Sequence, residues 1–311
     1  MNLSMEQGAQ SVLDWHEQRR GVRPHWRARL LDKPNGERLV AEYALGADGA
    51  AGEVVIGKCY AGEDGARTFG VMGEVRAALA ALPAKILALP EALWYDPMRR
   101  CLVQPRVPGV AFGELAGSAD FEAALDLAGE ALAELHDTDA VRGEPRRLAD
   151  HLCELVRPHP MVLAQAVPQL HARIERLLSG LERADATLGA SAPSTIHRDF
   201  HLRQLFLDEP RVWLIDWDLC ARGDAALDAG NFLMYLEVRL GEGAQGPARA
   251  FLQGYFRRAP ESRRPRIELY KGLNYLRRAC KAFRLGGADW REQSELMLGR
   301  AERSLAAYEG H

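Results

Sequence analysis

The chain has 311 residues, of which 47% are hydrophobic and 27% are charged, and its formal net charge is −3. This composition is typical of a globular protein with ample material for a core, and the length fits one large domain or two small ones. A net charge this close to zero gives no global electrostatic reason to expect binding to nucleic acid or to an anionic membrane.

Targeting and redox features are those of a cytoplasmic protein. The polar start, MNLSMEQGAQSVLDWHEQRR, lacks the apolar segment of a signal peptide, and no run of about 18 apolar residues predicts a membrane span. The five cysteines are scattered, odd in number and form no C-x-x-C pair. This pattern favours reduced thiols over a disulfide framework or a zinc site.

The first hundred residues predict an N-terminal helix, a mostly antiparallel sheet and one further helix. Residues 1–20 predict a short amphipathic helix, and VMGEVRAALAAL (71–82) predicts a second helix. The PNG sequence at 34–36 is a hairpin turn signal. Short apolar runs predict strands at RARLL (27–31), RLVAEYAL (38–45), EVVIGKCY (53–60), ALWYD (92–96) and RCLVQP (100–105).

After the VPG sequence at 107–109 the pattern becomes mainly helical. Helical periodicity covers residues 118–136, 147–157 and 161–185, and four more helical segments follow residue 218. The predicted fold class is therefore α+β. We expect a small β-rich N-terminal lobe over residues 1–104 and a larger, mainly helical C-terminal lobe over residues 105–311.

The stretch STIHRDFHLRQLFLDEPRVWLIDWD (194–218) carries the candidate chemistry. The apolar runs around Asp208-Glu209-Pro210 predict a tight hairpin. Asp199 precedes this hairpin, Gln204 stands where its first strand begins, and Asp216 stands where its second strand ends. Hard oxygen ligands of this kind suit Mg²⁺, which binds substrate phosphates with only one or two protein carboxylates. Asp199 could then accept a proton from an attacking hydroxyl, which is the equipment of phosphoryl transfer.

These residues resemble a known family. HRDFHLRQ followed by IDWD is similar to the H-x-D-x-x-x-x-N and I-D-x-x motifs of the aminoglycoside phosphotransferase and choline kinase-like family, within the protein kinase-like superfamily. The resemblance covers nearly the whole chain and implies a bilobal kinase-like fold. It implies that Asp199 is the catalytic base, Asp216 the main metal ligand and His197 a structural residue of the catalytic loop.

Further roles follow from the same resemblance. The RGDAALDAGNF segment is similar to the family's G-D-P-x-x-D-L-A segment, so that Asp228 would brace the catalytic loop. The chain departs from the family at Gln204, where the family has Asn. Glutamine offers the same amide oxygen on a longer stem, so we expect Gln204 to remain a metal ligand.

The N-terminal lobe carries matching nucleotide-binding candidates. VVIGK places Lys58 at the end of a predicted strand. Kinase-like folds use a lysine in this position to bind the α- and β-phosphates of ATP. Glu74, in the following helix, is expected to pair with Lys58. LVQPRVPG resembles the family's hinge, in which Pro105 would supply a carbonyl and Val107 an N–H to adenine. The sequence contains no G-x-G-x-x-G motif, the glycine-rich loop that covers the phosphates in protein kinases.

The acceptor is expected to be a small alcohol. Only 12 positions separate Asp216 from Asp228, which leaves no room for the long activation loop of a protein kinase. His201, Trp217 and Asp218 are possible acceptor contacts. The C-terminal helix RRPRIELYKGLNYLRRACKAFR is strongly basic. It is either a solvated face or a surface that favours an anionic or neutral acceptor, contested by the acids Asp218, Asp224 and Glu237. Aromatic candidates for a choline-like cage are Trp217, Phe232, Tyr235 and Tyr275.

The sequence thus favours transfer of the γ-phosphoryl group of ATP, with Mg²⁺, to a small-molecule hydroxyl, with GTP as a possible replacement for ATP. Two alternatives stay open. A catalytically weak or inactive nucleotide-binding regulator is suggested by Gln204. A metal-dependent hydrolase would use the same carboxylates and leave Lys58, Glu74 and the hinge without a role.

Overall fold

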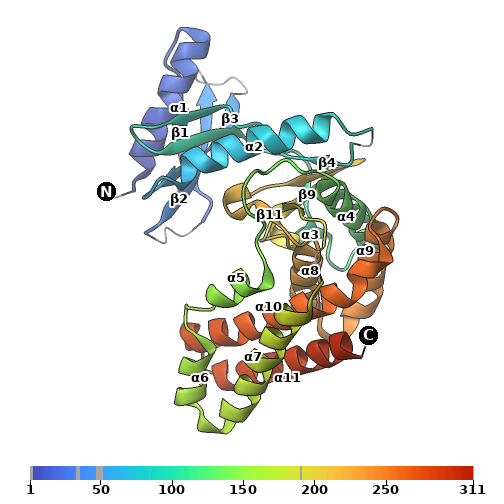
Figure 1. The fold of residues 1–311 in the computed structure, drawn as a ribbon. Coiled ribbons are helices and arrows are strands. Elements are labelled where there is room, and N and C mark those ends of the chain that lie inside the picture. Colours follow the sequence, from blue (N-terminus) through green and yellow to red (C-terminus); the bar gives the residue numbers. More distant parts are fainter. Residues whose placement is uncertain (1–2, 33–35, 47–51, 84, 190, 311) are drawn as a thin grey trace. The chain divides into compact units, whose positions relative to one another are not determined.

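The computed structural model describes residues 3–32, 36–46, 52–83, 85–189 and 191–310. The chain forms two compact units, one made of residues 1–111 and 205–220 and the other of residues 112–204 and 221–311 (Figure 1). The first unit is rich in strands and the second is mainly helical, so the predicted α+β class is confirmed.

Unit 1 contains a five-stranded antiparallel sheet and the two predicted helices. The sheet order is β1-β2-β3-β6-β5. Helix α2 begins at Asp64 rather than at the expected Val71, and the expected turn at 34–36 falls mostly outside the described residues. The elements are α1 (Met5–Arg20), β1 (His25–Leu30), β2 (Arg38–Gly46), β3 (Glu53–Tyr60), α2 (Asp64–Ala80), β5 (Trp94–Asp96) and β6 (Cys101–Pro105).

Because side chains alternate along a strand, this sheet has two different faces. One face packs on α1 and is called the core face; the other carries Arg38, Lys58 and Tyr60 and is called the site face. Leu39, Ala41, Tyr43 and Leu45 of β2 share a buried cluster with residues of α1, because alternate side chains of a strand point to the same side. The antiparallel register pairs Arg38 with Tyr60 and Val40 with Lys58. Arg38, Lys58 and Tyr60 therefore lie on the face opposite α1.

The hairpin 205–214 belongs to unit 1, although it lies far along the chain. Its strands complete a second sheet of order β4-β10-β9-β7. This sheet consists of β4 (Leu87–Ala88), β7 (Val110–Ala111), β9 (Leu205–Asp208) and β10 (Arg211–Leu214). The division of the chain therefore differs from a single boundary at 104/105, because the hairpin pairs with strands that precede residue 112.

Unit 2 contains the predicted helices and a small two-stranded sheet. The four helical segments expected after residue 218 are all present. The one expected over 161–185 is divided near Pro168, whose missing N–H disfavours a continuous helix. The helices are α3 (Phe112–Leu115), α4 (Phe121–His136), α5 (Leu148–Cys153), α6 (Pro160–Ala166), α7 (His171–Thr187), α8 (Ala226–Leu240), α9 (Gln245–Phe256), α10 (Arg264–Leu285) and α11 (Trp290–Glu309); the strands are β8 (Ser194–Ile196) and β11 (Ala221–Gly223).

A close helix contact fixes α8 against α10. Gly230 of α8 has no side chain, and a Cβ there would lie 2.8 Å from the backbone nitrogen of Lys271. The two helices pack backbone to backbone at this point. The packing sets the position of the first turn of α8, which contributes to the candidate site.

Two whole-chain expectations can be checked in the structure. All five cysteines are free. Within the described residues, no helix combines the length and the apolar character needed to cross a membrane.

We predict that Gly57→Ala destabilises the protein. A Cβ on Gly57 of β3 would lie 2.8 Å from Cε2 of the buried Tyr43, and overpacking of this kind typically costs about 1–3 kcal/mol. The free energy of unfolding from urea titration measures the loss. Gly70→Ala is the matched control, since its Cβ meets nothing within 4 Å. In the interior of α2 the added methyl group should stabilise the protein by about 1 kcal/mol. Equal effects of the two substitutions would contradict the packing argument.

Candidate active site

A cluster of opposite charges lies on the site face of the sheet in unit 1. The Nζ atom of Lys58 lies 2.5 Å from Oδ1 of Asp216 and 2.7 Å from Oδ2 of Asp218. Arg38 adds a second cation, with Nη1 at 3.3 Å from Asp216 and 3.0 Å from Asp218. The side chain of Lys58 is 8% exposed, so water screens its ion pairs only weakly.

Neighbouring polar groups fix Asp218 within this cluster. Its Oδ1 atom accepts hydrogen bonds from the Tyr60 hydroxyl at 2.8 Å and the Thr68 hydroxyl at 3.3 Å. Arg67 of α2 donates to the backbone carbonyls of Asp218 and Cys220. Burial and then the charge of Asp218 raise the pKa of Tyr60, so its hydroxyl stays a donor. Asp218, which the sequence offered as a possible acceptor contact, lies beside Lys58 in unit 1.

Asp216 adopts an uncommon backbone conformation. It follows β10 with φ 68° and ψ 65°, in the left-handed region that residues other than glycine rarely occupy. Conformations of this kind are costly and gather at functional sites. Here the conformation begins the 3₁₀ turn η3 (Trp217–Leu219) and turns the Asp216 carboxylate toward Lys58.

The expected ion pair between Lys58 and Glu74 is not formed. Glu74 is exposed on α2, whereas Thr68, Val71, Val75 and Leu79 lie on the buried face of that helix. At 100° per residue, Glu74 is turned well away from this face. Lys58 pairs with Asp216 and Asp218 instead. The apolar spacing at 71, 75 and 79 was the signal that could have placed Glu74 outside.

The predicted hinge residues lie at the end of β6. Pro105 is the last residue of that strand and is paired in register with Val55 of β3. Val107 follows outside any strand, and its N–H has no hydrogen-bond partner among the described residues. A backbone carbonyl and a backbone N–H two residues apart remain compatible with the expected adenine contacts.

The catalytic-loop candidate belongs to unit 2 and is held by one buried carboxylate. Asp228, in the first turn of α8, accepts hydrogen bonds from the backbone N–H groups of His197 at 2.6 Å and Arg198 at 2.7 Å. The side chain of Asn231 donates to the carbonyl of Phe200 at 3.2 Å. Arg198 has φ 69°, a conformation that these bonds must hold in place.

Asp228 is kept ionised although it is fully buried. Burial raises its pKa, but the net shift is downward, and the hydrogen bonds from His136 and from the backbone N–H of His197 are among the contacts that lower it. Burial lowers the pKa of His136, which favours its neutral form. Nε2 of His136 then donates to Asp228 at 3.2 Å, and its Nδ1 accepts from the hydroxyl of Tyr255 at 3.0 Å.

Asp199 is oriented from two sides within unit 2. Nε2 of His201 lies 3.4 Å from Oδ1 of Asp199, and Nε2 of Gln204 donates to Oδ2 at 3.4 Å. The Nδ1 atom of His201 accepts from the backbone N–H of Arg203, so its ring proton belongs on Nε2, toward Asp199. The amide nitrogen of Gln204 therefore faces Asp199, and the role of its Oε1 atom as a metal ligand stays a prediction.

The other predicted site residues have different surroundings. His197 is fully buried, as a structural residue of the loop would be. Trp217 is 1% exposed and its indole N–H donates to the carbonyl of Leu214, so it is packed in unit 1 and does not offer a surface to an acceptor. Phe232 and Tyr275 are also fully buried, which leaves Tyr235 as the one accessible member of the expected aromatic cage.

The described residues contain no group of three or more His, Cys, Asp or Glu side chains that could hold a metal. Asp216 and Asp218 nevertheless converge on the same cations. Such a donor set fits a metal that takes most of its remaining ligands from water and substrate phosphates.

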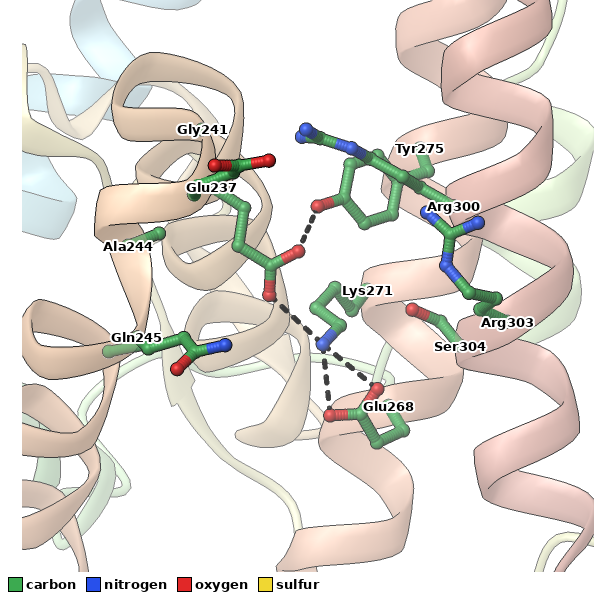
Figure 2. A pocket seen from close by; sticks show the side chains of 12 residues that line it. Glu237, Gly241, Ala244, Gln245, Glu268, Lys271, Tyr275, Arg300, Arg303 and Ser304 are labelled. Carbon is green, nitrogen blue, oxygen red and sulfur yellow. Dashed lines mark hydrogen bonds and ion pairs between the residues drawn. The ribbon is translucent and has the colours of Figure 1, made fainter.

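A pocket of about 420 Å³ lies between α8, α10 and α11 in unit 2 (Figure 2). Lys271 stands between Glu237 at 3.1 Å and Glu268 at 3.0 Å, and Tyr275 donates to Glu237. Burial and Glu237 raise the pKa of Tyr275. The charges on this flank of α10 are therefore largely balanced within the protein.

Comparison with known proteins then identifies the family. A model of the phosphotransferase enzyme family matches residues 48–266. The chain belongs to this family. A search of curated proteins gave no match.

Solved structures of phosphotransferases share the fold. A choline/ethanolamine kinase family protein from Mesorhizobium loti has 18% identity and a TM-score of 0.65, covering 92% of this chain and 93% of its own. A thermostable mutant of aminoglycoside phosphotransferase APH(4)-Ia, in a ternary complex with ADP and hygromycin B, has 18% identity and a TM-score of 0.65, with 96% and 98% covered. The macrolide 2'-phosphotransferase MphH from Brachybacterium faecium has 20% identity and a TM-score of 0.56, with 93% and 97% covered. These similarities establish the kinase-like fold.

We predict that Asp228→Asn destabilises this phosphotransferase. Asparagine would turn an NH₂ group toward backbone N–H donors or leave one of them unpaired, and loss of a buried charged partner costs about 3–5 kcal/mol. Urea unfolding measures the change. Asp137→Asn is the control, because Asp137 is an exposed partner of Arg258 and the median worth of such surface pairs is about 0–1 kcal/mol. A loss for Asp228→Asn no larger than for Asp137→Asn would show that the buried carboxylate does not hold the loop.

Proposed function

We propose that the protein is an ATP- and Mg²⁺-dependent small-molecule kinase that transfers the γ-phosphoryl group to an alcohol. The observation that carries the proposal is the convergence of Lys58 and Arg38 with Asp216 and Asp218 in unit 1. Cations that can hold phosphates and carboxylates that can hold a metal come together there from a sheet and a distant hairpin. The family match supports phosphoryl transfer as the reaction class.

Nucleotide binding would use Lys58, Arg38 and the hinge. A triphosphate offers oxygens to which both cations can bind, and the backbone of Pro105 and Val107 offers an acceptor and a donor to the base. The neighbour crystallised with ADP and hygromycin B supports a nucleotide and a small molecule as the two substrates. GTP is the alternative nucleotide, since backbone contacts leave little trace of base preference in side chains.

Asp216 would hold Mg²⁺, with Gln204 as the expected amide ligand. Asp218, which contacts the same lysine as Asp216, offers a further carboxylate. A bound Mg²⁺ neutralises charge on the phosphate oxygens during transfer. The residues of the chain hold the phosphates, orient the acceptor and remove its proton.

Asp199 would act as the general base. As the acceptor oxygen forms its bond to the γ-phosphorus, the bond from phosphorus to the β-phosphate oxygen breaks and ADP leaves. The hydroxyl proton passes to the Asp199 carboxylate, whose position depends on His201, Gln204 and the loop held by Asp228. The short connection from Asp216 through η3 and β11 to α8 favours a small acceptor over a protein chain.

A nucleotide-binding regulator is the second candidate, and Gln204 in place of Asn favours it. A metal-dependent hydrolase is less well supported, because Lys58 contacts the candidate metal ligands and would have no role in simple hydrolysis.

Thermal melting with ATP or GTP, with and without Mg²⁺, tests the nucleotide site directly. A ligand that binds only the folded protein stabilises it by RT ln(1 + [L]/Kd). We expect a Mg²⁺-dependent rise in Tm at millimolar nucleotide, followed by acceptor-dependent release of ADP. A rise in Tm without transfer to any of a panel of sugars, amino alcohols and aminoglycosides would favour the regulator. No rise with either nucleotide would contradict both.

We predict that Asp199→Asn lowers kcat by about 10²-fold or more, because the amide cannot accept the hydroxyl proton. Steady-state ADP release measures kcat, and the nucleotide-dependent rise in Tm should persist. Asp139→Asn, which alters an exposed ion pair with Arg222 in the same unit, should leave kcat unchanged. Unchanged turnover in Asp199→Asn would remove the assignment of the base.

We predict that Gln204→Asn retains activity within about tenfold of the natural chain, because it supplies the same amide oxygen to the metal. Gln204→Ala removes that oxygen and should raise the Mg²⁺ concentration needed for half-maximal ADP release. Equal Mg²⁺ dependence in Gln204→Ala and the natural chain would show that Gln204 is not a ligand.

A further inference from the structure

The region around Asp199 in unit 2 carries several cations that form no ion pair with an acid among the described residues. Arg203 of the catalytic segment and Arg278, Lys281 and Arg284 of α10 have no ion pair with Asp or Glu anywhere in the described ranges. Arg277 donates to the side chain of Asn274 and the carbonyl of His151, which are both neutral. This basic cluster, defined as Arg203, Arg277, Arg278, Lys281 and Arg284, is the unusual feature of the site.

The first half of α10 provides an internal comparison. Arg264 pairs with Glu261 at 2.9 Å, Arg266 pairs with Asp224 at 2.5 Å, and Lys271 pairs with two glutamates. Figure 2 shows Lys271 between its glutamates on the pocket side of the helix. The acids Asp224 and Glu237, which the sequence left as possible contacts for a cationic acceptor, are therefore already neutralised. Along a single helix, the cations change from paired to unpaired where the helix reaches the surroundings of Asp199.

A chain of ring contacts connects the basic cluster to Asp199. His201, 3.4 Å from Asp199, has its ring centroid 4.6 Å from that of Tyr235. On Tyr235 the guanidinium of Arg278 lies 5.7 Å from the ring centroid. An aromatic face, rather than an acid, positions Arg278, so its N–H donors remain available to a ligand.

The cations also influence one another. Burial and then the charges of Arg278 and Arg284 lower the pKa of Lys281, while Asp199 acts in the opposite direction. The dipole of α10 favours cations near its C-terminus and accounts for part of the arrangement. It does not account for Arg203, which belongs to the short segment η2 (Leu202–Gln204). Like charges held together in this way lose their repulsion when an anion binds among them.

We propose that the acceptor alcohol carries an anionic group, a carboxylate or a phosphate, which Arg278, Lys281 and Arg203 bind while the hydroxyl lies at Asp199. The inference rests on the proposed function, since it names the substrate class of the same site. Guanidinium groups bind carboxylate and phosphate oxygens through paired, charge-assisted hydrogen bonds. A polycationic aminoglycoside would meet like charge here, and a choline-like cation would find one accessible aromatic ring.

Matched acceptors test the proposal through turnover. ADP release is measured with glycerol against glycerol 3-phosphate, with glucose against glucose 6-phosphate and gluconate, and with kanamycin. We expect the anionic member of a pair to have a kcat/KM at least about tenfold higher, as one good charged contact provides. A higher value for a neutral or cationic acceptor would overturn the proposal.

Anion binding tests the same proposal without turnover. The probe is inorganic phosphate at constant ionic strength set with chloride, and the readout is the Tm of the full chain. We expect phosphate to raise Tm, and the double variant Arg278→Gln/Lys281→Met to lose that rise. The control variant Arg257→Gln/Arg264→Gln removes the same charge from ion-paired surface positions and should keep it.

The outcomes separate this inference from the proposed function. An equal phosphate response in the double variant and the natural chain, or no response beyond that of chloride, would overturn the anionic acceptor. The Mg²⁺-dependent response to ATP is read in parallel and should persist in both variants. If ATP with Mg²⁺ does not raise the Tm of the natural chain while phosphate does, the kinase proposal is overturned and an anion site beside Asp199 is left.

Discussion

The buried carboxylate of Asp228 is the constraint on which the arrangement of unit 2 depends. A carboxylate without water is stable only when hydrogen bonds and charges replace its hydration, and Asp228 receives two backbone N–H groups and His136. These bonds hold Arg198 in a left-handed conformation and thereby fix the direction in which the chain presents Asp199. The close contact of α8 with α10 through Gly230 fixes Asp228 itself. The packing of α8 on α10 thus positions Asp228, and Asp228 in turn positions the candidate base Asp199.

In unit 1 the charged side chains form a cluster, whereas in unit 2 a single carboxylate is buried. Strand alternation and the register of β2 with β3 place Arg38, Lys58 and Tyr60 on one face, and the hairpin supplies Asp216 and Asp218. Each cation is balanced by a carboxylate, so the cluster is stable within the protein. Under the proposed function, phosphate oxygens take over the cations while a metal takes over the carboxylates. That exchange keeps the local charge balanced, which is why one cluster could hold both the phosphates and the metal.

The strands, the hairpin and the candidate catalytic residues could be predicted from the sequence because their signals are local. Apolar alternation gave the strands, Asp208-Glu209-Pro210 gave the hairpin, and the spacing from His197 to Asp216 gave the candidate chemistry. The pairing of Lys58 with Asp216 and Asp218 depends on docking of the hairpin between β4 and β7, strands of two residues each that carry no sequence signature. The exposure of Glu74 was within reach of helical periodicity, whereas the ion pairs of Arg266 and Lys271 join elements far apart in the chain.

The family match and the acceptor are determined by different parts of the molecule. At 18% identity, the structural neighbours share the elements that hold Asp199 and Asp216, yet identity this low says nothing about which alcohol is bound. Acceptor choice must come from side chains that the fold does not require. The second half of α10 has this property. Arg278, Lys281 and Arg284 form no ion pair within the described part of the chain, and burial and the charges of the two arginines lower the pKa of Lys281. Arg266 and Lys271 of the first half, by contrast, are held in ion pairs. Residues that the fold does not need, gathered around the candidate base, are where specificity for the acceptor is to be sought.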